Sequence, residues 1–371
     1  MKVTWSEPTI GKQELDSVVN SFEASWLTMG PKVKKFEKLF SSFLDVNNAV
    51  AVNNGTTALD LTLKALGVRA DDEVIVPAMT YIATASTVLY QRAVPVFVDI
   101  EKETFNLDPE RIEEAISPKT KAILFIDYGG NPAYINEIIE VGRKKGISVI
   151  QDAAQSLGGK YKDHNLGSQT LISAMSFHMA KVMTTVEGGM VLTHDDELAE
   201  KIRIMRNQGE DPQRKYHHIM LGTNARMTDM QAAIGIEQFK KLEDNIKKRR
   251  EIAKKYDNYF EKIDDVKVVK DHPEQDCINA YFFYPVLIPQ RDSVAYLLRE
   301  RGVDTRIAYP MVVYKQDMFV NSENPCKFQE CPVAEEFTSK VINLPIFPDI
   351  REEEIDYVAT NLIDILRPKR S

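Results

Sequence analysis

Short apolar runs alternate with amphipathic segments through the first two-thirds of the chain. The apolar runs predict strands at residues 48–53, 73–78, 94–100, 121–128 and 146–152. The segments that follow the first four runs have helical spacing, at residues 56–67, 81–91, 108–116 and 133–145. Such alternation, with strands that are apolar throughout, is typical of a parallel sheet covered on both faces. Ligands of these sheets bind beyond the carboxyl ends of the strands, so we expect the chemistry in the loops that follow them.

The pattern changes in the last third of the chain. A long helical pattern runs from Met227 to Phe260, with small apolar residues in its first half and many charges in its second. We expect the first half to be buried and the second, including KKRRE at residues 247–251, to present a solvated face. A separate αβ pattern follows, with AYFFYPVLI as a strand and SVAYLLRERG as a helix. We therefore predict a large domain over residues 1–245 and a smaller carboxy-terminal domain over residues 246–371.

Composition narrows the possible class of protein. With 371 residues, 43% of them hydrophobic, the chain can bury a sizeable core. Its net charge of −8 argues against nucleic acid or an anionic membrane surface as the main partner. The amino terminus lacks an apolar signal segment and no run is long enough to cross a bilayer, so a cytoplasmic location is expected. The three cysteines predict no disulfide framework, and CKFQEC lacks a second ligand pair, so no metal site is expected.

One lysine stands out in SFHMAKVMTTVEGGMV, residues 176–191. Lys181 lies among small, hydroxylated and apolar residues, where a salt bridge, an exposed loop and a catalytic amine are all possible. Earlier in the chain, Asp152 comes directly after a strongly apolar strand and should need a cationic partner. Taken alone, Asp152 is explained more simply as a helix N-cap or in a salt bridge. Its functional interpretation is an anchor for a protonated ring nitrogen, with Gln155 bonding a nearby ring substituent.

Three further features suit a phosphorylated planar cofactor. In NNGTTALDLTLKAL, Thr56 and Thr57 lie at a strand-to-helix turn whose free N–H groups and helix dipole favour phosphate, although a plain N-capping turn gives the same pattern. No GKS/T follows this turn, and no dinucleotide glycine fingerprint is present. Tyr81, just beyond another strand, is able to stack on a ring, although a lone tyrosine more often packs or caps. Ser176, with Thr184 or Thr185, is able to bind phosphate oxygens.

Together these features indicate one kind of site. A lysine in a partly desolvated site has a lowered pKa and can act as a nucleophile or general base. A phosphate cradle, an aromatic platform, a carboxylate and an amine, in this order along an α/β chain, make up a pyridoxal 5'-phosphate site.

Motifs that occur in a fixed order over most of the chain resemble those of one protein family. They are SWLTMGPKVKKFEKLF, NNGTTALDLTL, VIVPAMTYIATAS, VPVFVDIEKETFNLDPERIEEAI, DYGGNPAYINEI, QDAAQSLGG, SFHMAKVMTTVEGGMV, GTNARMTDMQAAIGIEQF, RGVDTRIAYP, CPVAEEF and INLPIFP. The chain closely resembles the DegT/DnrJ/EryC1/StrS family of sugar aminotransferases, in the fold-type I (aspartate aminotransferase) superfamily. The resemblance implies a large domain with a mostly parallel sheet between helices, a smaller carboxy-terminal α/β domain, and pyridoxal 5'-phosphate.

By that resemblance, four residues would surround the cofactor ring. Lys181 would bind the cofactor covalently and move protons. Asp152 would keep the ring nitrogen protonated, Gln155 would contact the ring hydroxyl, and Tyr81 would stack on the ring.

The resemblance also implies how phosphate and substrate are held. Thr56, Thr57 and Ser176 would bind the phosphate. Asn224 would reach the phosphate of the neighbouring subunit, because active sites in this family form across a homodimer interface. Arg226 would hold an anionic part of the substrate or, equally well, form an ion pair at the interface.

The implied reaction transfers nitrogen from glutamate, with release of 2-oxoglutarate, to a nucleotide-linked keto-sugar. Sugar dehydratases of the family have histidine at the lysine position, so Lys181 favours transamination. TTVEGGM and DYGGNPAYI are similar to members that aminate C4 of a 4-keto-6-deoxy sugar; a 3-keto-sugar or cyclitol transaminase and a non-catalytic regulator are the alternatives. Two departures bear on the substrate: Val186 replaces a glycine of the family pattern, and Ala225 replaces a frequent aromatic.

Overall fold

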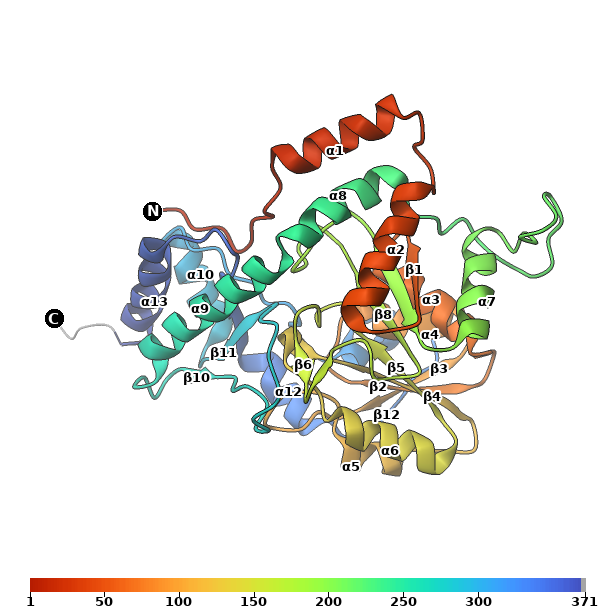
Figure 1. Cartoon of the computed structure of the whole chain (residues 1–371). Coiled ribbons are helices and arrows are strands. Elements are labelled where there is room, and N and C mark those ends of the chain that lie inside the picture. Colours follow the sequence, from red (N-terminus) through yellow and green to blue (C-terminus); the bar gives the residue numbers. More distant parts are fainter. Residues whose placement is uncertain (368–371) are drawn as a thin grey trace.

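The computed structural model describes residues 1–367 and contains an eight-stranded sheet with helices on both faces (Figure 1). Its strands are β1 (Asn48–Val52), β2 (Glu73–Pro77), β3 (Val94–Val98), β4 (Thr120–Ile126), β5 (Ser148–Asp152), β8 (Ile172–Ser176), β9 (Gly189–Thr193) and β12 (Lys327–Phe328). Their order across the sheet is β1-β9-β8-β5-β4-β2-β3-β12. Only β9 is antiparallel to its neighbours, β1 and β8, while the pairs from β8 to β12 are parallel. The predicted fold class is confirmed.

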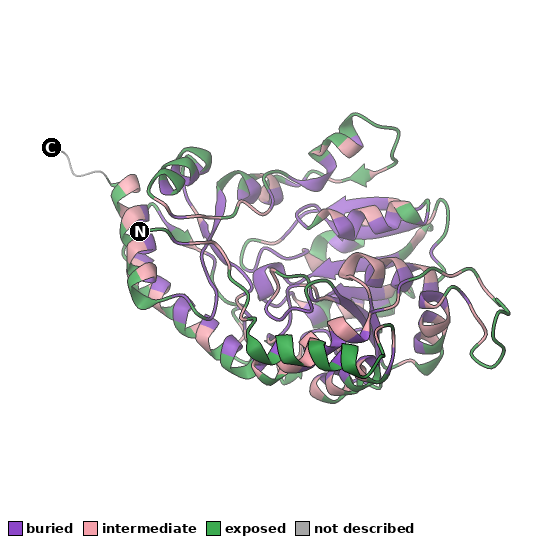
Figure 2. Cartoon of the chain, turned by 90° about the horizontal axis from the view of Figure 1, so that it is seen from above, coloured by how far each residue is buried: buried purple, intermediate pink, exposed green. Residues whose placement is uncertain are grey.

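Alternation along the strands places a hydrophobic core on each face of this sheet. In β4, Leu124 and Ile126 belong to one buried cluster, whereas Ile123 and Phe125 belong to another. The helices on the first face are α3 (Gly55–Ala65), α4 (Ile82–Tyr90) and α7 (Asp196–Arg206), and those on the second are α5 (Pro109–Ala115) and α6 (Ile135–Lys145). Figure 2 shows the strands buried between these layers. Burial on both faces explains why the strands are apolar throughout rather than alternating.

A second, smaller unit lies beside the large sheet (Figure 1). Its elements are β10 (Lys267–Val268), β11 (Tyr284–Leu287), β13 (Val341–Leu344), α9 (Leu242–Phe260), α10 (Arg291–Glu300) and α13 (Glu352–Leu366). The amino-terminal Val3 pairs with Val303 of this unit. Residues 309–341 return to the large core, where β12 pairs with β3. The boundary near residue 246 stays a prediction, and residues 368–371 lie outside the described part.

Nine further elements complete the described residues 1–367. They are α1 (Lys12–Glu23), α2 (Pro31–Leu44), η1 (Tyr128–Gly130), β6 (Lys160–Tyr161), β7 (His164–Asn165), α8 (Asp229–Lys240), η2 (Val313–Lys315), α11 (Asp317–Val320) and α12 (Pro332–Lys340). Among them, α1 packs on α8.

The single helix expected from Met227 to Phe260 is wrong. The structure has two helices, α8 and α9, separated at Lys241, whose N–H donates to Gln238 O at 3.0 Å, only three residues back. The side chain of Lys241 pairs with the buried Glu14 of α1 at 2.5 Å, so this residue makes a tertiary contact at the interruption. The solvated face expected for residues 247–251 is also wrong at Arg249, which is 3% exposed.

Candidate active site

The turn between β1 and α3 lies unusually close to the strands next to it. A Cβ atom on Gly55 would lie 2.8 Å from Ser176 Cβ, and one on Gly189 would lie 2.4 Å from the carbonyl carbon of Asn54. Glycine at these two positions therefore allows the backbones to approach, because a side chain would collide. As a result, Ser176 at the end of β8 lies beside the predicted phosphate turn.

Two side-chain hydroxyls at this turn are available for hydrogen bonding. Asn54 caps α3 by accepting from Thr57 N at 2.8 Å. Within residues 1–367, the hydroxyls of Thr56 and Thr57 have no hydrogen-bond partner in the chain. Free hydroxyl donors at the amino terminus of a helix suit a phosphate group, because the dipole adds positive potential there. The three residues predicted to bind phosphate are thus brought together.

Asp152 and Lys181 lie at the same edge of the sheet, because Asp152 is the last residue of β5 and Lys181 follows the neighbouring parallel strand, β8. Asp152 is buried, and its two carboxylate oxygens accept from Thr84 Oγ1 at 2.9 Å and from Ala154 N at 3.1 Å. Burial raises the pKa of Asp152, while these two hydrogen bonds and the charge of Lys181 oppose the rise. A cation bound next to Asp152 would stabilise its charged form, as a protonated ring nitrogen does.

Lys181 is half-buried, which argues against a simple exposed-loop lysine. No carboxylate in residues 1–367 lies within 4.0 Å of its amine, so it forms no direct salt bridge there. Burial lowers the pKa of Lys181 to about 8, and the charge of Asp152 partly opposes that shift. An amine of this kind is available as a nucleophile and base near neutral pH.

Gln155 is held by contacts on both ends of its amide. Its Oε1 accepts from Gly129 N at 2.9 Å, and its Nε2 donates to the hydroxyl of Tyr309 at 2.8 Å. One N–H of the amide remains free, because a side-chain NH₂ carries two donors. Tyr309 and Thr84 are therefore neighbours of the site that sequence reasoning missed, although both lie in quoted motifs.

Tyr81 caps α4 and is 61% exposed, so its ring is available as a platform. It lines a cavity of about 400 Å³ with Ile82, Tyr309, Pro310 and Met311. The lining is largely apolar, with a few polar groups, which is typical of small-molecule sites.

Asn224 and Arg226 lie on an extended segment that pairs with the end of β1. The N–H of Asn53 donates to Ala225 O at 3.0 Å, and the backbone of Arg226 forms an isolated antiparallel β-bridge with Val52. The side chain of Asn224 is exposed. Arg226 Nη1 donates to Asn207 Oδ1 at 2.9 Å. Ala225, between these two residues, is fully buried, and a small side chain fits there.

The loop after Lys181 holds Val186, where the resemblance implies a glycine, in an unusual backbone conformation. Val186 has φ +71°, in the left-handed region that β-branched residues rarely adopt. Thr184 accepts from Val186 N at 2.8 Å and donates to Phe177 O at 3.1 Å, while Thr185 donates to Glu187 O at 2.8 Å. These two hydroxyls thus shape the loop, and Ser176 is the hydroxyl of this stretch that lies beside the phosphate turn.

Replacing Val186 with glycine should raise the free energy of unfolding by about 0.5–1 kcal/mol, because relief of left-handed strain outweighs the added entropy of the unfolded chain. Urea denaturation measures the change. The matched control is Val19→Gly on the exposed face of α1, which should lower the free energy of unfolding by a similar amount. Destabilisation of both variants would show that the loop is not strained at Val186.

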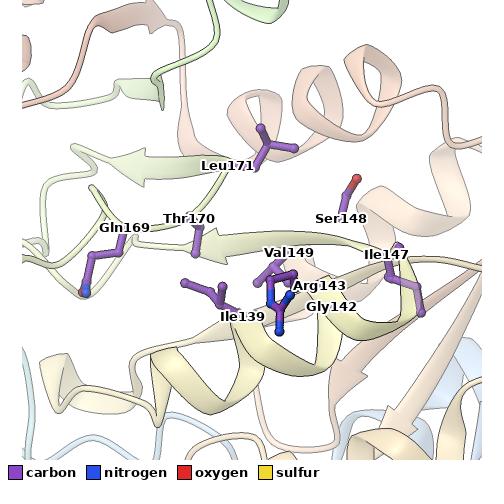
Figure 3. Close-up of a pocket in the computed structure, with 10 residues that line it drawn as sticks. Ile139, Gly142, Arg143, Ile147, Ser148, Val149, Gln169, Thr170 and Leu171 are labelled. Carbon is purple, nitrogen blue, oxygen red and sulfur yellow. The ribbon is translucent and has the colours of Figure 1, made fainter.

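A different cavity, of about 340 Å³, lies between α6 and the loop before β8 (Figure 3). The only charged residue among those that line it is Arg143, which pairs with Glu140 at 2.8 Å. It therefore offers no acid–base group, and it lies away from the carboxyl ends of the strands.

Residues 1–367 contain neither a candidate membrane-spanning helix nor a candidate metal-binding cluster. None of the helices in residues 1–367 has the length and apolar character needed to cross a membrane. In the same range, no three His, Cys, Asp or Glu side chains are grouped so as to hold a metal ion.

Comparisons with known proteins find relatives over nearly the whole chain. The sequence profile of the DegT/DnrJ/EryC1/StrS aminotransferase family matches residues 8–363. The GDP-perosamine synthase of Caulobacter vibrioides is 34% identical over 372 residues, covering 98% of each protein. The UDP-2-acetamido-2-deoxy-3-oxo-D-glucuronate aminotransferase of Pseudomonas aeruginosa is 36% identical and covers 90% of each. The structure of Helicobacter pylori PseC, an aminotransferase involved in the biosynthesis of pseudoaminic acid, has a TM-score of 0.92 and 29% identity, and covers 99% of each chain.

Proposed function

Because the chain belongs to the DegT/DnrJ/EryC1/StrS aminotransferase family and is a pyridoxal-phosphate-dependent sugar aminotransferase, we propose that it transfers the amino group of glutamate to a nucleotide-linked 4-keto-6-deoxyhexose. The observation that carries the catalytic part is the half-buried amine of Lys181, with a lowered pKa, at the sheet edge shared with the buried Asp152.

The residues around this edge fit the cofactor, and we propose their roles accordingly. Thr56, Thr57 and Ser176 bind the phosphate, because their hydroxyls converge at the amino terminus of α3. Tyr81 stacks on the ring with its exposed face. These assignments rest on the close approach at Gly55 and on the free hydroxyls at the turn.

Asp152 and Gln155 set the charge on the ring. Asp152 keeps a proton on the ring nitrogen, since its buried carboxylate needs a cationic neighbour. Gln155 offers its free N–H to the ring hydroxyl, held in place by Gly129 and Tyr309. Pyridoxal 5'-phosphate itself supplies the electron sink.

Lys181 performs the proton transfers in both halves of the reaction. Its amine removes the proton from the α-carbon of glutamate and, in the second half, delivers one to the sugar carbon that receives nitrogen. A pKa of about 8 suits this alternation, because proton transfer is most efficient when the pKa of the base lies near the working pH.

Two features support the 4-keto-6-deoxy assignment. TTVEGGM and DYGGNPAYI are similar to members that act at C4. The cavity beside Tyr81 has apolar walls from Ile82, Pro310 and Met311, which suit the methyl group of a 6-deoxy sugar. The Pseudomonas aeruginosa relative, whose name specifies a 3-oxo sugar, supports the alternative of a 3-keto-sugar or cyclitol transaminase.

A panel of nucleotide-linked 3-keto and 4-keto sugars, with and without the 6-hydroxyl, tests the substrate. With glutamate as donor, release of 2-oxoglutarate should be fastest with a 4-keto-6-deoxy sugar. A higher kcat/KM for 3-keto sugars or cyclitol ketones would support the alternative. Failure to convert any of them, in protein that binds the cofactor, would point to a non-catalytic regulator.

We also propose that Asn224 acts in the active site of a partner subunit. Neither Lys181→Ala nor Asn224→Ala should be active alone, but a mixture refolded into mixed dimers should recover activity. In a mixed dimer, one site combines an intact Lys181 with the partner's intact asparagine. If Asn224 instead acts within its own chain, no mixed dimer contains an intact site and activity stays absent. Sedimentation of both variants controls for assembly.

A further inference from the structure

A ring from the carboxy-terminal third of the chain lies against the amine of Lys181. Lys181 Nζ is 4.5 Å from the centroid of the Phe282 ring, within the range of a cation–π contact. Phe282 is 5% exposed and lies in the segment before β11, about a hundred residues away in sequence. Because the two residues are far apart in the sequence, no local pattern near Lys181 indicates this contact.

The backbone around Phe282 is bonded directly to the turn that holds Gln155. The N–H groups of Ala280 and Phe283 donate to Gly130 O at 2.9 Å and Gly129 O at 3.2 Å. Gly129 in turn donates to Gln155 Oε1 at 2.9 Å. The ring of Phe282 is therefore fixed relative to a residue that we assign to the cofactor.

The residue before Phe282 has strained backbone. Tyr281 has φ +50°, a left-handed conformation that is uncommon for a bulky residue. Asn279 Oδ1 accepts from Tyr281 N at 2.8 Å, and the buried Arg249 donates to Tyr281 O at 3.1 Å. Such strain persists only where the surroundings impose it, and it is concentrated at functional sites. Here it directs the following side chain towards Lys181.

We propose that Phe282 is a positioning residue for Lys181: its ring holds the amine at the sheet edge shared with Asp152 and excludes water from one side. The proposal rests on the proposed function of Lys181. The negative face of the ring attracts the protonated amine, and its edges restrict the rotamers of a long, flexible side chain. The amine is thereby kept where it accepts and delivers a proton.

The test follows the reactivity of Lys181 in cofactor-free protein. Acetic anhydride modifies the unprotonated amine, and mass spectrometry of the peptide that contains Lys181 gives the rate at each pH. Phe282→Leu keeps an apolar side chain but removes the ring. It should move the midpoint of the pH profile downward and raise labelling at pH 7 about three-fold, because loss of a cation–π contact destabilises the charged amine. Phe282→Tyr keeps the ring and should restore the wild-type midpoint.

The matched control is Phe260→Leu, the same change at a buried ring of α9 that stacks on Tyr256, away from Lys181. It should leave the midpoint unchanged. Greater access alone would raise the plateau rate at high pH without moving the midpoint. If Phe282→Leu does not fold, Phe282→Met carries the same expectation.

An unchanged or raised midpoint in Phe282→Leu, or an equal shift in Phe260→Leu, overturns the proposal. Its failure is distinguishable from failure of the proposed function, which is tested separately by whether Lys181 binds the cofactor in wild-type protein.

Discussion

Replacing Lys181 with alanine should lower the rate of transamination by about 10⁴-fold or more, because both the covalent anchor and the proton-transferring base are lost. The variant should also lose the visible absorbance of the lysine-bound cofactor. Both are measured on purified protein, with release of 2-oxoglutarate as the activity assay. The fold should be unaffected, since Lys181 forms no ion pair with a carboxylate in the described part of the chain.

Lys144→Ala, which removes an exposed lysine of α6, is the matched control and should keep full activity. Substantial transamination by Lys181→Ala, for example within ten-fold of wild type, would mean that another group moves the proton.

Replacing Asp152 with asparagine should lower kcat by about 10²–10³-fold, the effect of breaking one buried charge pair. Asparagine keeps the shape of Asp152 and its one carbonyl oxygen can still accept one of the two hydrogen bonds, from Thr84 or Ala154, but it cannot balance a protonated ring nitrogen. The same change should lower the pKa of Lys181 further below about 8, because the charge of Asp152 raises it in the wild type. Labelling of Lys181 in the cofactor-free variant should therefore begin at lower pH.

Asp163→Asn, at an exposed turn, controls for the loss of one negative charge. A nearly wild-type kcat for Asp152→Asn would argue that this carboxylate is structural, as its N-cap interpretation suggests.

The fold could be predicted largely from the sequence because the strands of the parallel part are buried on both faces. Their unbroken apolar runs, separated by amphipathic segments, leave few alternatives to a covered parallel sheet. The interruption at Lys241 was not predictable in the same way. Helical spacing continues through it, and the ion pair that Lys241 forms there is with Glu14, more than two hundred residues away in sequence.

The residues of the candidate site also fall into two groups, those that the sequence predicts and those that it does not. Thr56, Asp152 and Lys181 were predictable because each follows a strand, and parallel strand ends meet at one edge. Phe282 and Tyr309 were not, because they reach this edge from the distant carboxy-terminal part of the chain.

The departure at position 186 was visible in the sequence, but its physical meaning required the structure. The sequence alone does not indicate backbone strain at this valine, whereas its φ of +71° does. The sequence pattern shows which residue differs from the family, whereas the backbone conformation shows why glycine is the residue expected.

The proposed role of Lys181 is tested most directly by finding which residue binds the cofactor. Wild-type protein is incubated with pyridoxal 5'-phosphate, reduced with borohydride, digested and mapped by mass spectrometry. A visible absorbance band should appear before reduction, and a single pyridoxyl group should be found on Lys181. The absence of a band and of any label, or a label on a different lysine, would contradict this role.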